Sequence, residues 1–123
     1  MELPRQILIE KGVMRRLGAF VNDLKGNAKN ICIISGNTVK SRVYEQCQEA
    51  LSNTFYKMRW YETPATKLDQ VLMLQSIIAK DHPEIILGIG GGRSVDVAKI
   101  ISYNLNIPYI SVPTSASHDG ISS

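Results

Sequence analysis

Residues 84–99 decide the fold and read EIILGIGGGRSVDVAK. Glu84–Ile89 is a run of strand length that is apolar after its first residue, and from Ser94 the apolar residues recur at the spacing of a helix. Three consecutive glycines, Gly90 to Gly92, lie between the two segments. A strand, a short loop and a helix in this order predict a βαβ unit, in which a helix joins two parallel strands.

The same alternation continues on both sides of this segment. Continuous apolar runs such as NICII at residues 30–34 are typical of strands that helices cover on both faces, as in parallel sheets. We therefore expect one α/β domain over residues 1–123, doubly wound around a mostly parallel, Rossmann-like sheet. The predicted strands are Gln6–Glu10, Asn30–Ser35, Phe55–Tyr61, Glu84–Ile89 and Tyr109–Val112, and the predicted helices are Val13–Leu24, Thr38–Leu51, Leu68–Lys80 and Ser94–Asn104.

Composition excludes several classes of protein. The chain has 123 residues, of which 44% are hydrophobic and 20% charged, and these proportions exclude a disordered or fibrous chain. No apolar run reaches the roughly 20 residues that cross a bilayer, and the first residues lack a signal peptide. Cys32 and Cys47 follow no metal or redox spacing, so we expect a reduced, cytoplasmic protein. The 14 Lys and Arg residues give a net charge of +3 but are dispersed, which argues against nucleic-acid binding.

The glycine loop suits a phosphate group. It would place backbone N–H groups at the positive end of a helix, and glycines would let a diphosphate approach the backbone. The loop departs from the dinucleotide fingerprint GxGxxG, since Arg93 stands at the third glycine position, and it has no Walker lysine. The alternative is a plain tight turn. One glycine would suffice for that turn, and three before a Ser94 that can cap a helix favour phosphate or diphosphate. Asp96 and Lys99 lie in the first two turns of the predicted helix. They could take part in binding, or they could be ordinary helix-surface residues.

The last residues, 113–123, read PTSASHDGISS and follow the final predicted strand. Open α/β sheets bind ligands at this edge. His118 and Asp119 could form a turn, shuttle a proton or hydrogen-bond a substrate, and the residues alone leave these alternatives open. A Ser117-His118-Asp119 triad is excluded because consecutive side chains diverge. Two histidines remote in sequence do not assemble a metal site.

Two motifs carry a resemblance to a known family. Residues 88–99 (GIGGGRSVDVAK) resemble the GGGxxxDxxK signature of the iron-containing alcohol dehydrogenase-like superfamily. Residues 112–123 (VPTSASHDGISS) resemble the loop Pro-Thr-(Ala/Ser)-Ala-Ser-His-Asp-Gly of the sn-glycerol-1-phosphate dehydrogenases. Alcohol dehydrogenases of the superfamily usually carry Pro-Thr-Thr-Ala-Gly-Thr-Gly there, and glycerol dehydrogenases have Thr-Asp after the Ser. The resemblance extends over all 123 residues.

This resemblance implies roles for individual residues. The glycines would meet the diphosphate of NAD or NADP, the loop after Pro113 would line the cofactor further along, and Asp119 would hydrogen-bond the substrate. The residues implied to border the cofactor are Gly91, Gly92, Arg93, Ser94, Val95, Asp96, Thr114, Ser115, Ala116, Ser117 and Ser123.

It also implies an activity for a longer protein. Such enzymes reduce dihydroxyacetone phosphate to sn-glycerol 1-phosphate, the backbone of archaeal membrane lipids, with NADH or NADPH and a zinc ion. Their metal ligands, an Asp and two His, belong to a C-terminal helical domain. We therefore expect this chain to be the cofactor-binding N-terminal half, without catalytic or metal residues of its own, inactive alone and part of a homo-oligomer when full length. The alternatives are another metal-dependent polyol or alcohol dehydrogenase, or a stand-alone nucleotide-binding module.

The choice between the two cofactors depends on the end of the second predicted strand. An acidic residue there commonly binds the adenosine ribose and repels a 2′-phosphate. The turn reads Ser35-Gly36-Asn37-Thr38, without a carboxylate, and Lys40 and Arg42 follow. The sequence therefore predicts that NADPH is accepted at least as well as NADH, unless the two cations are only exposed helix residues.

Overall fold

The computed structural model describes residues 5–6, 17–24, 28–52, 57–65 and 67–113. In this part of the chain, five strands form one parallel sheet in the order β1-β5-β4-β2-β3. The prediction of a doubly wound parallel α/β fold is confirmed. In chain order the elements are β1 (Arg5–Gln6), α1 (Leu17–Leu24), β2 (Asn30–Ser35), α2 (Asn37–Ser52), β3 (Lys57–Glu62), α3 (Leu68–Asp81), β4 (Ile85–Gly90), α4 (Gly92–Leu105) and β5 (Tyr109–Pro113).

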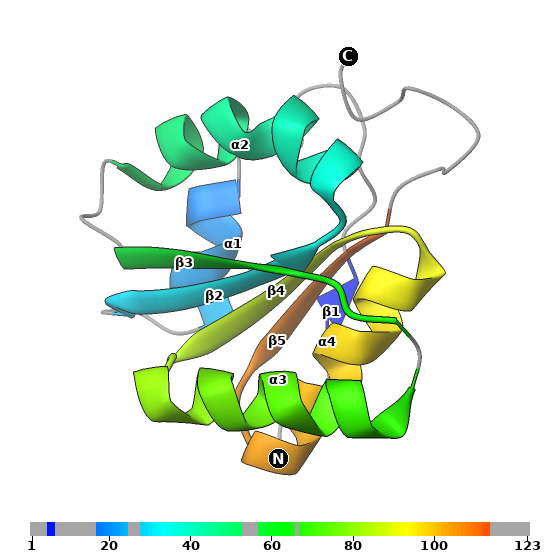
Figure 1. Cartoon of the computed structure of the whole chain (residues 1–123). Helices are drawn as coiled ribbons and strands as arrows, with labels where there is room; N and C mark the ends of the chain where they lie inside the picture. Colours follow the sequence, from blue (N-terminus) through cyan, green and yellow to red (C-terminus); the bar gives the residue numbers. More distant parts are fainter. Residues whose placement is uncertain (1–4, 7–16, 25–27, 53–56, 66, 114–123) are drawn as a thin grey trace.

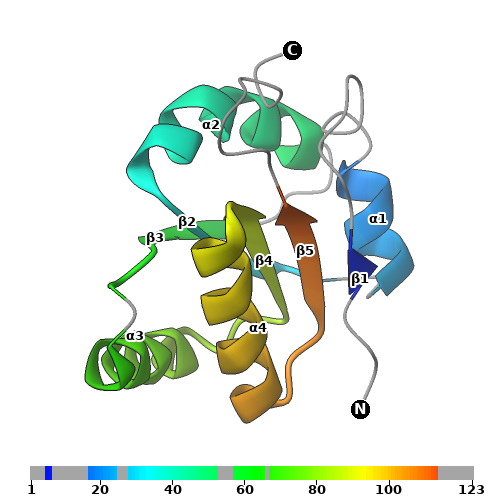
Figure 2. The same cartoon turned by 90° about the vertical axis from the view of Figure 1, so that its right-hand side faces the viewer.

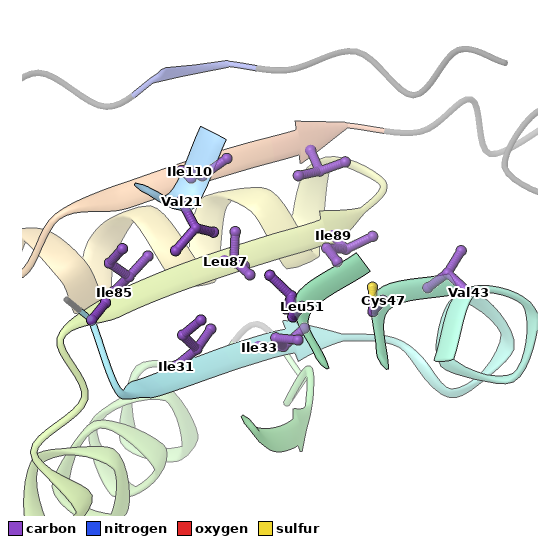
Figure 3. Packing of buried hydrophobic residues seen from close by; sticks show 12 residues of the cluster. Val21, Ile31, Ile33, Val43, Cys47, Leu51, Ile85, Leu87, Ile89 and Ile110 are labelled. Atoms are coloured by element: carbon purple, nitrogen blue, oxygen red, sulfur yellow. The ribbon is translucent and has the colours of Figure 1, made fainter. Parts of the chain in front are cut away.

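Helices cover both faces of the sheet. In Figure 1, α2 lies above the sheet, and α3 and α4 lie below it. α1 is seen behind β2 and β3, and its Val21 packs in the same cluster as residues of α2. Along β2, Ile31 and Ile33 belong to the cluster of buried residues on the α1/α2 face, whereas Cys32 and Ile34 belong to the cluster on the α3/α4 face. Figure 3 shows the first of these clusters. Burial on both faces explains why β2 is an unbroken apolar run.

Several element boundaries differ from the prediction. α4 begins at Gly92, two residues before the predicted Ser94, so part of the glycine stretch is itself helical. The third strand begins at Lys57 rather than Phe55, and its half-exposed pattern fits its place at the edge of the sheet. α3 ends one residue later than predicted, with His82 in the left-handed conformation (φ 52°) before Pro83. Residues 7–10 of the first predicted strand lie outside the described residues.

Gly88 lets α4 lie close against β4. A Cβ atom built on Gly88 would stand 2.7 Å from the Cβ of Ala98 in α4, and 3.3 Å from both the Ser94 carbonyl oxygen and the Tyr109 ring. Two of these neighbours are parts of the helix, so neither can move without shifting α4. A side chain at this position would therefore push α4 away from the sheet.

The substitution Gly88→Ala tests this close approach. We expect it to lower the free energy of unfolding by about 1–3 kcal/mol, the usual cost of overpacking, in a chemical denaturation experiment. Gly36→Ala is the matched control, because a Cβ on Gly36 meets no atom within 4 Å and its φ is not positive. The control should change stability by less than about 1 kcal/mol. Equal stability of Gly88→Ala and the parent chain would contradict the packing described here.

The two cysteines are free and buried on opposite sides of the sheet. Cys32 lies in the cluster on the α3/α4 face, and Cys47 of α2 lies in the cluster on the α1/α2 face. Burial raises the pKa of each thiol from 9.0 to about 12. The reactive thiolate is therefore scarce at neutral pH, and reagents have little access to it.

A thiol-labelling experiment tests the burial of the two cysteines. At pH 8 the folded chain should react with a disulfide reagent far more slowly than the denatured chain, which should release both thiols at once. The comparison needs only absorbance readings in buffer and in denaturant. Fast labelling of either cysteine in buffer would show that the cluster around it is accessible to solvent, which would contradict the burial described here.

No helix in the described ranges is long and apolar enough to span a membrane.

Candidate functional site

The candidate site lies where two neighbouring strands send their connections to opposite faces. β2 and β4 are paired along the sheet, but β2 leads into α2 on one face and β4 leads into α4 on the other. Figure 2 shows α2 above the ends of β4 and β5 and α4 in front of β4. In open parallel sheets this topological switch point forms the crevice that binds ligands.

The glycine loop lies at this switch point. Gly90 has φ +141°, a conformation that favours glycine, and a Cβ there would lie 3.2 Å from the Ser94 hydroxyl oxygen. Gly91 is the N-cap residue, with an extended backbone, and no side chain caps the helix. The first N–H groups of a helix have no partner within it, so those of α4 are available to an anion at this edge.

Gly91 and Gly92 have no structural reason to be glycine. Gly91 has φ −74°, which any residue can adopt, and Gly92 is the first residue of α4. A Cβ on either would meet no atom within 4 Å. The turn itself therefore needs only Gly90. The other two glycines leave open space directly over the helix N-terminus, which is the space that a diphosphate against the backbone requires.

The next residues divide between the protein interior and solvent. Ser94 and Val95 are buried, whereas Arg93 and Asp96 are exposed in the first turns of α4. The expectation that Ser94 caps the helix is wrong, because the helix begins before it and its Oγ lies 2.6 Å from the Thr63 hydroxyl oxygen. Tyr109 donates a hydrogen bond to the Val95 carbonyl oxygen at 2.8 Å, and burial raises the pKa of Tyr109 to about 12. Its hydroxyl therefore stays protonated and holds the first turn of α4.

The end of β3 is hydrogen-bonded to the end of β2 and to the first turn of α4. The Thr63 N–H donates to the Ser35 carbonyl oxygen at 2.9 Å, and the Thr63 hydroxyl reaches Ser94. One residue earlier, the carboxylate of Glu62 accepts a hydrogen bond from the Asn37 side-chain amide at 2.9 Å. Thr63 and Glu62 were not among the predicted site residues. Their position could have marked them as candidates, since both are polar residues at the carboxyl end of a parallel strand, where such sheets bind ligands.

The structure changes the interpretation of the turn after β2. A carboxylate does stand beside Asn37, but Glu62 of the neighbouring strand supplies it. The Lys40 ammonium nitrogen lies 5.7 Å from the centre of the Tyr44 ring and 5.8 Å from that of Trp60, within range of cation–π attraction. Lys40 is therefore held against the aromatic side chains rather than being a cation without contacts.

The remaining predicted site residues cannot be placed. Pro113 ends β5, and the residues of the loop after it lie outside the described residues. Those predicted residues are Thr114, Ser115, Ala116, Ser117, Asp119 and Ser123.

A metal does not fit the part of the chain that the structure describes. No group of three His, Cys, Asp or Glu residues in that part could hold an ion. We therefore assign no chemical step to a metal.

A hollow lies at the opposite edge of the sheet. It has a volume of about 330 Å³ and is lined by Ala79, His82, Pro83, Leu105 and Ile107. These residues lie at or just after the ends of α3 and α4, so the hollow is at the edge where the strands begin. It lies away from the edge where parallel sheets bind ligands.

Comparisons with known sequences identify the family of the chain. The family model described as iron-containing alcohol dehydrogenase matches residues 8–123. "Glycerol-1-phosphate dehydrogenase [NAD(P)+]" of Nitrosopumilus maritimus is 41% identical over 123 residues, covering 100% of this chain and 34% of the relative. The protein of the same name from Methanosarcina acetivorans is 38% identical over 125 residues, again covering 100% and 34%. The chain thus spans about a third of the length of these curated relatives.

Solved structures share the fold. Glycerol dehydrogenase of Schizosaccharomyces pombe superposes with a TM-score of 0.75 at 20% identity, over 89% of this chain and 27% of that one. An iron-containing alcohol dehydrogenase of Thermotoga maritima gives a TM-score of 0.74 at 18% identity, over 92% and 36%. At these identities the superpositions establish the fold alone. The family match over residues 8–123 shows that the chain belongs to the iron-containing alcohol dehydrogenase family.

Proposed function

We propose that this chain is the NAD(P)-binding part of an sn-glycerol-1-phosphate dehydrogenase. The observation that carries the proposal is the open space over Gly91 and Gly92, at the N-terminus of α4 and beside the switch point between β2 and β4. A diphosphate in this space would accept hydrogen bonds from the first N–H groups of α4. The exposed Arg93 guanidinium lies in the same turn and would add a positive charge.

The substrate proposal rests on the relatives and on the last motif of the sequence. Relatives named glycerol-1-phosphate dehydrogenase match the whole chain, and residues 113–120 carry the Pro-Thr-Ser-Ala-Ser-His-Asp-Gly pattern. We propose that Asp119 hydrogen-bonds dihydroxyacetone phosphate, and that Thr114, Ser115, Ala116, Ser117 and Ser123 line the cofactor. In a protein of the relatives' length, NADH or NADPH would supply hydride to the ketone. We also propose that the longer protein is cytoplasmic, homo-oligomeric and zinc-dependent, with its metal ligands outside this chain.

The substitution Gly92→Ala tests the diphosphate site. Alanine is a better helix former than glycine, so the free energy of unfolding should stay the same or rise by up to about 1 kcal/mol. NADH binding should weaken by about tenfold or more, because the new methyl group occupies the space of the diphosphate and blocks its hydrogen bonds. Binding can be titrated through the fluorescence of Trp60, the single tryptophan, which lies in β3.

Ser76→Ala is the control, since Ser76 is exposed on α3 and donates only to the Leu72 carbonyl oxygen of its own helix. It should leave NADH binding unchanged. The proposed site would be wrong if Gly92→Ala bound NADH as tightly as the parent chain.

The substrate is tested on a protein of the relatives' length. We expect oxidation of NADH or NADPH, followed at 340 nm, with dihydroxyacetone phosphate and little with unphosphorylated dihydroxyacetone. The 123-residue chain alone should bind cofactor without this turnover. Preference for the unphosphorylated ketone would instead favour another polyol dehydrogenase of the family.

A further inference from the structure

We propose that Glu62 makes this site select NADH over NADPH, by pairing with the adenosine ribose and repelling a 2′-phosphate. The inference rests on the proposed function, since it concerns the cofactor at the same crevice. It reverses the expectation from the turn sequence, because the carboxylate that the turn lacks comes from β3.

Glu62 stands close to the diphosphate site. Its neighbour Thr63 places a hydroxyl 2.6 Å from the Ser94 Oγ, in the first turn of α4. Consecutive Cα atoms are about 3.8 Å apart, so the backbone of Glu62 lies beside the helix end that would hold the diphosphate. In a dinucleotide the adenosine ribose is bonded to the diphosphate. A group beside the diphosphate site is therefore in position to meet that ribose.

The Glu62 side chain lies on the same face of the sheet as α2. Side chains alternate along a strand, and Met58 and Trp60 of β3 both pack on the α1/α2 face. Glu62 shares this face, and its hydrogen bond from Asn37 holds the carboxylate at the start of α2. Both residues are exposed, so a ligand can reach them. A carboxylate with further lone pairs can accept the hydroxyl protons of a ribose diol, while the Asn37 amide oxygen and second N–H remain for the same diol.

The local charge disfavours a 2′-phosphate. α2 has no acidic residue in its first turn, so its positive end would attract a phosphate if nothing opposed it. Glu62 supplies a full negative charge at that end, and a phosphate monoester carries roughly −1.5 to −2 at pH 7. Lys40, the cation next along α2, has its ammonium over the Tyr44 and Trp60 rings. The Glu62 carboxylate at the start of α2 would therefore repel a 2′-phosphate more than an uncharged diol.

The experiment compares NADH and NADPH binding to the parent chain and to Glu62→Gln. The parent chain should bind NADH about tenfold more tightly than NADPH, as expected for repulsion between a carboxylate and a phosphate at partly screened range. Glu62→Gln keeps an oxygen that can accept the Asn37 hydrogen bond but removes the charge. Its ratio of dissociation constants should therefore fall close to one, mainly through tighter binding of NADPH. Both cofactors carry the same diphosphate, so a general effect of the substitution on the glycine loop would change both dissociation constants alike. Such an effect cancels in their ratio.

Glu45→Gln is the matched control, because Glu45 is exposed on α2 eight residues after Asn37, about 12 Å along the helix. It should leave the ratio unchanged. Equal affinity of the parent chain for the two cofactors, or an unchanged ratio in Glu62→Gln, would overturn the inference while leaving the proposed function intact. Failure of both cofactors to bind the parent chain would overturn the proposed function and this inference with it.

Discussion

The binding edge of this protein depends on the close approach of α4 to β4. Gly88 permits that approach, because any side chain there would collide with Ala98 and the backbone of Ser94. Tyr109 fills the space beside Gly88 and donates to the Val95 carbonyl oxygen, which fixes the first turn of the helix. These contacts together set the position of the N-terminus of α4. Without this packing, the N–H groups of α4 would not lie beside the crevice between β2 and β4.

A small polar network joins the ends of β2 and β3 to the first turns of α2 and α4. Ser35 at the end of β2 accepts hydrogen bonds from the Trp60 indole through its hydroxyl and from the Thr63 N–H through its carbonyl oxygen. Thr63 in turn reaches Ser94 of α4, while Glu62 reaches Asn37 of α2. The end of β3 therefore connects the first turns of two helices that lie on opposite faces of the sheet. This connection holds the carboxylate that we propose for the ribose and the helix end that we propose for the diphosphate in one hydrogen-bonded network.

Much of the fold could be predicted because local patterns determine it. The runs at residues 30–34 and 84–89 have the length and β-branched content of buried strands, and strands that alternate with helical segments favour parallel pairing through right-handed crossovers. The exact start of α4 was missed because a serine was expected to act as the cap. Glycine can also occupy an N-cap position, and the Ser94 hydroxyl bonds Thr63 instead. The Asn37–Glu62 contact could not be read from sequence spacing, because it joins residues 25 positions apart through strand pairing.

The central claim is that the cofactor lies across the carboxyl edge of the sheet, from the glycine loop to Glu62. Backbone amide chemical shifts of the labelled chain, recorded during titration with NADH, test it most directly. We predict that the largest changes occur at Gly91, Gly92 and Arg93, with a second group at Asn37 and Glu62. Changes centred instead on His82 and Ile107, beside the hollow at the opposite edge, would contradict the account.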